Sequence, residues 1–302
     1  MNKKATKLLI LILLALIWGS SFILMKRGME VYTSGEVAAL RIFIAFVFLS
    51  PFVFKHVKRP LFKHWKALFA MGLLGNFIPA FLFTKAETGI SSSLAGMLNS
   101  LTPLFTLLLG VIIFKTKTTF INTIGILIGF IGAVGLITVG KTEDMNNNLA
   151  YGLLVMIATI CYALSVNIIK KYLNTVPPIT ATVGAFLLVG PFAGFYLFGF
   201  TDFTQKVVTG SHALQSLGFV CILAIVGTAI SVIIFNALIR STSALFASSV
   251  TYLIPIVAMA WGVFDNEAIL PLHFAWIGLI LLGVYLVNKK QKIANVPVLL
   301  KE

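Results

Sequence analysis

The chain has 302 residues, of which 59% are hydrophobic and only 11% are charged, and its mean hydropathy is +1.02. A soluble protein of this length would be nearer one-half apolar, so the composition excludes an ordinary soluble domain and indicates a protein of the lipid bilayer. The net charge of +14 does not indicate nucleic-acid binding, because the basic residues lie between the apolar stretches instead of forming one patch.

Apolar stretches of about 18 residues recur along the whole chain, and each can cross a hydrocarbon core of roughly 30 Å as a helix. We predict an all-α polytopic membrane protein with ten transmembrane helices. Their approximate ranges are 8–25, 37–54, 67–86, 91–114, 120–139, 150–169, 178–200, 213–235, 244–264 and 273–288. The first follows three lysines, but its apolar run has no clear small-x-small cleavage site, so we expect a helix and not a signal peptide.

The basic residues also predict the orientation of these helices. With a cytoplasmic N-terminus, the inner segments hold 17 of the 23 Lys and Arg residues and the outer segments hold five, while Arg41 lies within the second span. Of the nine acidic residues, eight fall on the outer side. This bias follows the positive-inside rule, so we expect both termini to be cytoplasmic.

The chain contains an internal repeat. Residues 18–27 align with 162–171 at an offset of 144, and residues 81–110 align with 233–262 at an offset of 152. Each unit has five spans, an odd number, so the second unit should be inverted relative to the first, as in many secondary transporters. The predicted parts are an N-terminal five-helix repeat (1–140), a connecting loop (141–149), a C-terminal five-helix repeat (150–290) and a cytoplasmic tail (291–302).

Polar side chains gather near the middle of six spans, the first, third, fourth, sixth, eighth and ninth. Such groups must face partners or water, so they predict a substrate cavity between these helices. The alternative is hydrogen bonding between helices with no ligand, at about 0.6 kcal/mol per contact. The cavity candidates are Trp18, Ser20, Ser21, Asn76, Asn99, Ser100, Tyr162, Ser165, Asn167, Thr228, Thr251 and Tyr252.

Two prolines lie at equivalent positions near the middle of the fourth and ninth spans, Pro103 and Pro255. Proline cannot donate to the carbonyl four residues back, so we expect the carbonyls of Asn99 and Thr251 to be freed and each proline to act as a hinge. A kink that only shapes packing is the alternative.

Arg41 is the only strongly basic residue well inside a span, where it would cost about 2.5 to 3.5 kcal/mol at the centre. Both a charged contact to the substrate and snorkelling to the outer surface remain open for it. No Asp or Glu lies near the middle of a span, and no His pair or Ser, His and Asp arrangement converges there. We therefore expect no enzyme activity, no catalytic residue, no metal site and no cofactor.

Four motifs, in an order and spacing that span nearly the whole chain, are similar to those of a known family. They are "IWGSSF" at 17–22, "ALRIFIA" at 39–45, "SSSLAGMLNSLTPLFTLLLGVIIF" at 91–114 and "TYLIPIVAMAWGVFDNE" at 251–267. They resemble the drug/metabolite transporter superfamily, in particular its EamA-type ten-helix members. The resemblance implies an inner-membrane exporter of small metabolites, often amino acids or related compounds. Members often carry a Glu after the fourth helix, where this chain has "KTKTT" at 115–119, although Glu267 follows the ninth.

We therefore expect an exporter of a small neutral or zwitterionic metabolite that works by alternating access. An importer, or a membrane scaffold or subunit that transports nothing, are the alternatives. The expected partners are a small-molecule substrate and the lipid bilayer, with no nucleic acid, and a homo-oligomer stays open. Without a carboxylate near mid-span, we expect no single Asp or Glu substitution to abolish transport.

Overall fold

The computed structural model describes residues 3–56, 60–116, 119–139 and 145–288, and every regular element within these ranges is helical. The expected all-α class is thus confirmed for the described residues. Within these described ranges, eight helical stretches are long and apolar enough to cross a membrane, and two shorter apolar helices, Phe120–Leu136 and Pro271–Val287, accompany them. The predicted tail at 291–302 lies outside the described residues.

The first half of the chain contains α1 (Lys3–Gly28), α2 (Ser34–Leu49), η1 (Ser50–Phe52), α3 (Val53–His56), α4 (Pro60–Gly72), η2 (Leu73–Phe77), α5 (Ile78–Ala86), α6 (Ser92–Leu98), η3 (Asn99–Leu101), α7 (Thr102–Ile112) and α8 (Phe120–Ile137). The second half contains α9 (Met145–Tyr172), α10 (Pro178–Phe200), α11 (Phe203–Thr209), α12 (Ala213–Ala224), η5 (Ile225–Ile230), α13 (Ser231–Ser241), α14 (Ala244–Ser248), η6 (Ser249–Tyr252), α15 (Ile254–Phe264) and α16 (Pro271–Asn288).

One expected boundary differs. We predicted a connecting loop at 141–149, but α9 already begins at Met145, so the last five of those residues are helical. The N–H groups of a first helical turn need no partner within the helix, so a polar run at 146–148 is compatible with that position. Residues 141–144 lie outside the described residues.

Charged contacts join several helix ends at one pole of the molecule, which we call the acidic end. Here Lys26, at the end of α1, contacts Glu267, which follows α15, and Lys206 of α11 contacts Glu36 of α2 at 2.7 Å. The hydroxyl of Ser216 in α12 donates to the Arg27 carbonyl. The end of α1, the starts of α2 and α12 and the end of α15 therefore lie together.

Helix ends also meet at the opposite pole, which we call the basic end. Lys7, near the start of α1, donates to the carbonyl of Ser241 at the end of α13. Lys170, near the end of α9, donates to the Ile239 carbonyl of α13 at 3.1 Å. Thus α1 runs from the basic end to the acidic end, whereas α9 and the α12–η5–α13 stretch both finish at the basic end.

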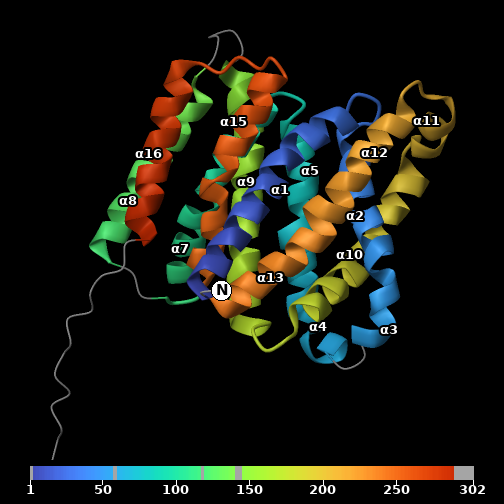
Figure 1. The fold of residues 1–302 in the computed structure, drawn as a ribbon, viewed down its shortest axis with the longest axis horizontal. Helices are drawn as coiled ribbons and strands as arrows, with labels where there is room; N and C mark the ends of the chain where they lie inside the picture. The colour runs from blue at the N-terminus through green and yellow to red at the C-terminus, as the bar shows by residue number, and fades with distance from the viewer. Residues whose placement is uncertain (1–2, 57–59, 117–118, 140–144, 289–302) are drawn as a thin grey trace, which may run out of the picture.

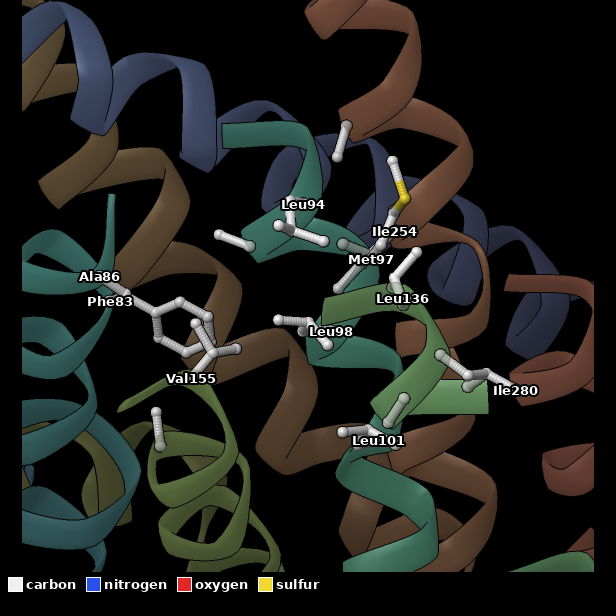
Figure 2. Close-up of a cluster of buried hydrophobic side chains, with 14 of the residues drawn as sticks. Phe83, Ala86, Leu94, Met97, Leu98, Leu101, Leu136, Val155, Ile254 and Ile280 are labelled. Atoms are coloured by element: carbon white, nitrogen blue, oxygen red, sulfur yellow. The ribbon is translucent and has the colours of Figure 1, made fainter. Parts of the chain in front are cut away.

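The apolar core is divided among the helix groups seen in Figure 1, where α8 and α16 stand at one side, α10 to α12 at the other, and α1 and α9 between them. One buried cluster joins α6 and α7 to α8, α9 and α16. Figure 2 shows Leu94, Leu98 and Leu101 in this cluster, between Val155 of α9 on one side and Ile280 of α16 on the other. A second cluster joins α2 to α10 and α12.

The two shorter helices, α8 and α16, pack closely against each other. A Cβ added at Gly125 of α8 would lie 2.5 Å from the Gly283 carbonyl oxygen of α16, so the two backbones touch where side chains are absent. The Asn122 amide of α8 also donates to the Val287 carbonyl at 2.6 Å. Small residues and an interhelical hydrogen bond are the means by which helices associate in lipid.

Candidate functional site

A cavity of about 90 Å³ lies among helices of both halves of the chain. Its lining comes from α1, α2, the α4–η2–α5 stretch, η3, α7, α9, α13, α14 and η6. These elements include all six spans that the polar pattern selected, together with α2, which contributes Arg41. The predicted residues that line it are Trp18, Ser21, Arg41, Asn76, Asn99, Tyr162, Ser165 and Thr251.

The remaining cavity candidates, Ser20, Ser100, Asn167, Thr228 and Tyr252, are not part of this lining. Asn167 donates its amide to the Thr106 carbonyl at 3.0 Å, and Ser20 accepts a hydrogen bond from Trp261. Ser100 is fully buried and donates to a carbonyl of its own helix. For Asn167, Ser20 and Ser100 the structure favours the alternative of hydrogen bonding within the helix bundle.

The cavity lining repeats itself between the two halves of the chain. At the offset of 144, α1 and α9 contribute matching residues, and at the offset of 152 the third and fourth spans match the eighth and ninth. The lining pairs are Trp18 and Tyr162, Ser21 and Ser165, Phe22 and Val166, Met25 and Ile169, Phe83 and Phe235, and Asn99 and Thr251. Sequence reasoning missed the apolar pairs because an apolar residue in an apolar helix gives no signal, although the repeat alignment could have found them.

The helices lose their regular α-helical form at equivalent places beside the cavity. A π-helical turn at Leu73–Phe77 matches another at Ile225–Ile230, again at an offset of 152. In the first turn, the side-chain amide of Asn76 donates to the carbonyl of Met71, five residues back, at 3.5 Å. In the second, the Thr228 hydroxyl donates to the carbonyl of Leu223, also five residues back, at 3.0 Å. Single π turns in helices are frequent at functional sites.

Each π turn holds a glycine against a serine of the other repeat. A Cβ added at Gly75 would lie 2.4 Å from the Ser165 hydroxyl oxygen, and one at Gly227 would lie 3.0 Å from that of Ser21. Since the two serines are repeat mates, the same contact is made twice. The glycines let α9 and α1 approach the π turns closely at the cavity wall.

The two prolines follow short 3₁₀ turns. Pro103 is the second residue of α7 and follows η3, and Pro255 is the second residue of α15 and follows η6. Proline is tolerated in the first turn of a helix, where its missing N–H is not needed. The helix therefore restarts at each proline.

The expectation that the Asn99 carbonyl is free of hydrogen bonds is wrong. That carbonyl accepts hydrogen bonds from the Thr102 N–H and from its hydroxyl at 2.8 Å, because the tighter 3₁₀ turn brings Thr102 within reach. Asn99 lines the cavity with its side chain nevertheless.

Arg41 is held in the cavity wall and does not snorkel away from it. Its Nε donates to the Thr228 hydroxyl at 2.7 Å, and the Tyr162 hydroxyl lies beside its guanidinium. Among the described residues, no carboxylate lies within ion-pairing distance of Arg41. The cavity thus contains a guanidinium whose charge has no acidic partner in the part of the chain that the structure describes.

Asn236 is a lining residue that sequence reasoning missed. Its amide nitrogen donates to the Thr182 hydroxyl at 2.9 Å, while its buried Oδ1 has no hydrogen-bond partner among the described residues. An unpaired buried acceptor is costly, so this atom is suited to a donor on a ligand. The isolated polar residue in an apolar helix was the available signal.

One compact cluster of charged groups joins several helix ends at the acidic end. Lys26 pairs with Asp265 and, at 3.0 Å, with Glu267. Glu267 also accepts hydrogen bonds from the backbone N–H groups of Ser92 and Ser93 at the start of α6. The carboxylate therefore joins α1, α6 and the end of α15, and its negative charge suits a helix N-terminus.

A cavity with polar and apolar lining residues from both halves of the chain therefore lies inside a bundle that contains membrane-length helices, an arrangement compatible with a carrier. A family model described as the EamA-like transporter family matches residues 5–138 and again residues 149–289, which is most of the chain. The chain belongs to the EamA-like transporter family, and the resemblance found in its motifs is confirmed.

Relatives are transporters by name. An "Uncharacterized transporter" of Archaeoglobus fulgidus is 28% identical over 287 residues, which cover 94% of this chain and 99% of the relative. The "Uncharacterized inner membrane transporter YedA" of Escherichia coli K12 is 26% identical, covering 91% and 88%. A "Probable amino-acid metabolite efflux pump" of Salmonella typhimurium is also 26% identical, covering 91% and 92%. The protein is a multi-pass membrane transporter.

A solved structure whose title names no function shares the fold. Its TM-score is 0.66 at 15% sequence identity, and the match covers 94% of this chain and 96% of the other. At this identity the likeness concerns the fold alone.

The carboxylate of Glu267 predicts a pH-dependent stability. Burial alone would raise its pKa, but hydrogen bonds from Ser93, Lys26 and Ser92 lower the pKa of Glu267 from 4.5 to about 2. A depressed pKa stabilises the fold above pH 4.5, and this contribution is lost as the pH falls through about 2. We expect Glu267→Gln to destabilise the protein by about 2 kcal/mol at neutral pH, measured by thermal unfolding in detergent.

The difference in unfolding stability between Glu267→Gln and the parent protein should become smaller as the pH falls below 4.5. Glu30→Gln is the matched control, because the Glu30 side chain is 50% exposed and pairs with Arg27 at the surface. Equal destabilisation by Glu267→Gln at acid and neutral pH would contradict the assigned role of its charge.

Proposed function

We propose that this transporter exports a small, carboxylate-bearing metabolite of the amino-acid class by alternating access. The observation that carries the proposal is Arg41, a permanent positive charge in the cavity wall with no acidic partner among the described residues. An ionisable residue inside the membrane is costly, and a ligand of opposite charge is the natural reason to keep one there.

The cavity offers complementary groups for such a substrate. The guanidinium of Arg41 is a fork of donors that suits a carboxylate, and the unpaired Oδ1 of Asn236 suits a donor such as an ammonium group. The Phe83 and Phe235 side chains supply apolar wall. A volume of about 90 Å³ is small for a drug-sized ligand, which supports a substrate of few atoms.

We also propose ten membrane-spanning helices in two inverted five-helix repeats, with α8 and α16 completing the count. The repeated π turns, the paired prolines and the two family matches support two related units. Contacts at the helix ends support the inversion, because α1 ends at the acidic end whereas its mate α9 ends at the basic end.

Export is favoured over import by the relatives named as efflux pumps. The alternative of a scaffold without transport is disfavoured by the polar cavity and by the family. An enzyme is disfavoured because the relatives are transporters. A small-molecule substrate and lipid remain the proposed partners, with no nucleic acid.

We propose that the acidic end faces outward in an inner membrane and that both termini are cytoplasmic. The asymmetry of basic residues supports this orientation. After removal of Cys161 and Cys221, a cysteine at exposed Thr88 should react with an impermeant thiol reagent added to intact cells, whereas one at exposed Ser241 should not. The reverse labelling pattern would invert the orientation.

The decisive experiment is untargeted profiling of metabolites in the medium of cells that express the protein, compared with an empty-vector strain. We expect a small set of carboxylate-bearing compounds to accumulate outside. Arg41→Gln should lower this release tenfold or more, since a charge-assisted hydrogen bond contributes about 1.5 to 3 kcal/mol. Arg240→Gln, which changes an exposed arginine at the basic end, is the control and should export normally.

Depletion of a compound from the medium would instead identify an importer. If Arg41→Gln released the metabolite as fully as the parent protein at normal membrane abundance, Arg41 would not belong to the substrate site. If the medium had the same metabolites as that of the empty-vector strain, the export proposal would be rejected.

The hinge role of the two prolines stays a proposal. Replacing Pro103 or Pro255 with Ala supplies an N–H that would allow a continuous α-helix across the 3₁₀ turn. Stability should therefore hold or rise slightly while turnover falls, because one access state becomes harder to reach. The two variants should shift thiol accessibility at Ser21→Cys and Ser165→Cys in opposite directions. Pro191→Ala in α10 is the control, as Pro191 lies outside the cavity lining. Matching destabilisation with one shared labelling pattern would indicate packing alone.

A further inference from the structure

Glu87 differs from the other described acidic residues near the cluster at the acidic end. Glu36 contacts Lys206, Asp265 contacts Lys26, and Glu267 is held by Lys26 and the α6 N-terminus. By contrast, both carboxyl oxygens of Glu87 are closed off from solvent and have no hydrogen-bond partner among the described residues. A carboxylate without a partner cannot stay ionised cheaply in such a place.

The charged groups around Glu87 come from several elements. Glu267, after α15, repels its negative charge, while Lys26 of α1 and Arg41 of α2 attract it from a distance. Lys26 is already shared by Asp265 and Glu267, and Arg41 is bound to Thr228. Neither cation is therefore in contact with the Glu87 carboxyl group.

The α9 helix packs on the same region and contributes two tyrosines. The Tyr151 ring lies against Gly89, two residues beyond Glu87, and the Tyr162 ring stacks on Phe83 with centroids 5.8 Å apart. Neither hydroxyl hydrogen-bonds to the Glu87 carboxyl oxygens. The surroundings thus favour the neutral acid: burial first, and then the charge of Glu267, raise the pKa of Glu87 well above its ordinary value.

Glu87 also connects the cluster to the cavity. Its N–H donates to the Phe83 carbonyl at 2.9 Å, so it lies one helical turn beyond a residue that lines the cavity. On its other side it is near Glu267, which joins α1 to α6. A charge that appears on Glu87 therefore acts on the contacts that close the acidic end.

We propose that Glu87 is a proton-binding site and that its protonation state controls the opening of the acidic end. When a carboxylate oxygen of Glu87 takes a proton from hydronium and releases water, the neutral acid fits the buried position and the cluster at Lys26 stays closed. When the proton leaves, the new negative charge repels Glu267 and attracts Lys26 away from its partners. Water must then enter to solvate Glu87, and the acidic end opens.

The direction of this switch suits export, an inference that rests on the proposed function. After a substrate leaves at the outer side, a proton taken up from the more acidic exterior closes the acidic end and prepares the carrier to open inward. The expectation that no single acidic residue is required for transport, drawn from the absence of mid-span carboxylates, stays a prediction, and the role proposed for Glu87 stands against it.

The first test measures opening directly. In a protein with Cys161→Ser, Cys221→Ser and Ser21→Cys, an impermeant thiol reagent is applied from the side that labels Thr88→Cys, from about pH 5 to about pH 9. The same cysteine in Glu87→Gln, which mimics the neutral acid, corrects for the pH dependence of the reagent. We divide the labelling rate of the protein with an unchanged Glu87 by the labelling rate of Glu87→Gln at each pH. We expect this ratio to rise severalfold as the pH rises.

Glu30→Gln is the matched control, because it removes a carboxylate from the same end of the molecule but from an exposed pair. It should keep the pH dependence of the parent protein. Glu87→Asp retains a carboxyl group and should keep a pH-dependent opening. A ratio that does not change with pH would overturn the proposal.

The second test detects the proton itself. Infrared difference spectra of the purified protein in lipid, recorded on raising the pH, should lose a carboxylic-acid carbonyl band in the parent and in Glu30→Gln. The band should be absent in Glu87→Gln. Its persistence there would assign the proton to another group and overturn the proposal.

These measurements use no substrate, so they separate the two proposals. Absence of metabolite release with a pH-dependent ratio and a Glu87 band would reject export but keep the proton site. Normal release with a pH-independent ratio would keep export and reject the proton site.

Discussion

The backbone of a membrane protein has no water to bond with, and this constraint governs the whole structure. Each N–H and C=O inside hydrocarbon needs a partner within the chain, so long helices are the default and any departure from them needs a local solution. Near the cavity, the departures among the described residues are the π turns η2 and η5 and the 3₁₀ turns η3 and η6, and side chains such as Thr102 and Thr228 bond to the carbonyls there. Residues of η2, η3 and η6 line the cavity, and η5 adjoins it through Thr228, whose hydroxyl accepts a hydrogen bond from the lining residue Arg41. The irregular turns of the helices and the cavity therefore occur at the same place in the bundle.

Electrostatics acts at the acidic end in two different ways. Around Lys26 the charges are matched and hydrogen-bonded, so Glu267 can be buried and still remain ionised. Glu87 is near the same cluster but has no such partner among the described residues. A paired carboxylate holds helices together, whereas an unpaired one responds to protons. The proximity of the two makes the closed end sensitive to a single charge.

Family membership and site chemistry answer different questions here. The two family matches and the relatives establish a transporter, but a fold shared at low identity does not select a substrate. Substrate choice must be argued from the cavity wall, where Arg41 and Asn236 offer a donor fork and an unpaired acceptor.

The sequence by itself determined the helical class, the approximate spans, the repeat and the six cavity-bordering spans, because hydrophobic length and isolated polar residues are local signals. Only the tertiary structure decided which polar side chains face the cavity: Ser21 lines it, whereas Ser20 bonds to Trp261. It also showed Thr102 bonding to the Asn99 carbonyl, and the carboxyl oxygens of Glu87 closed off from solvent at a helix end that the sequence placed near the surface. Hydrogen-bond partners and burial depend on residues far away in the chain, and no local pattern can specify them.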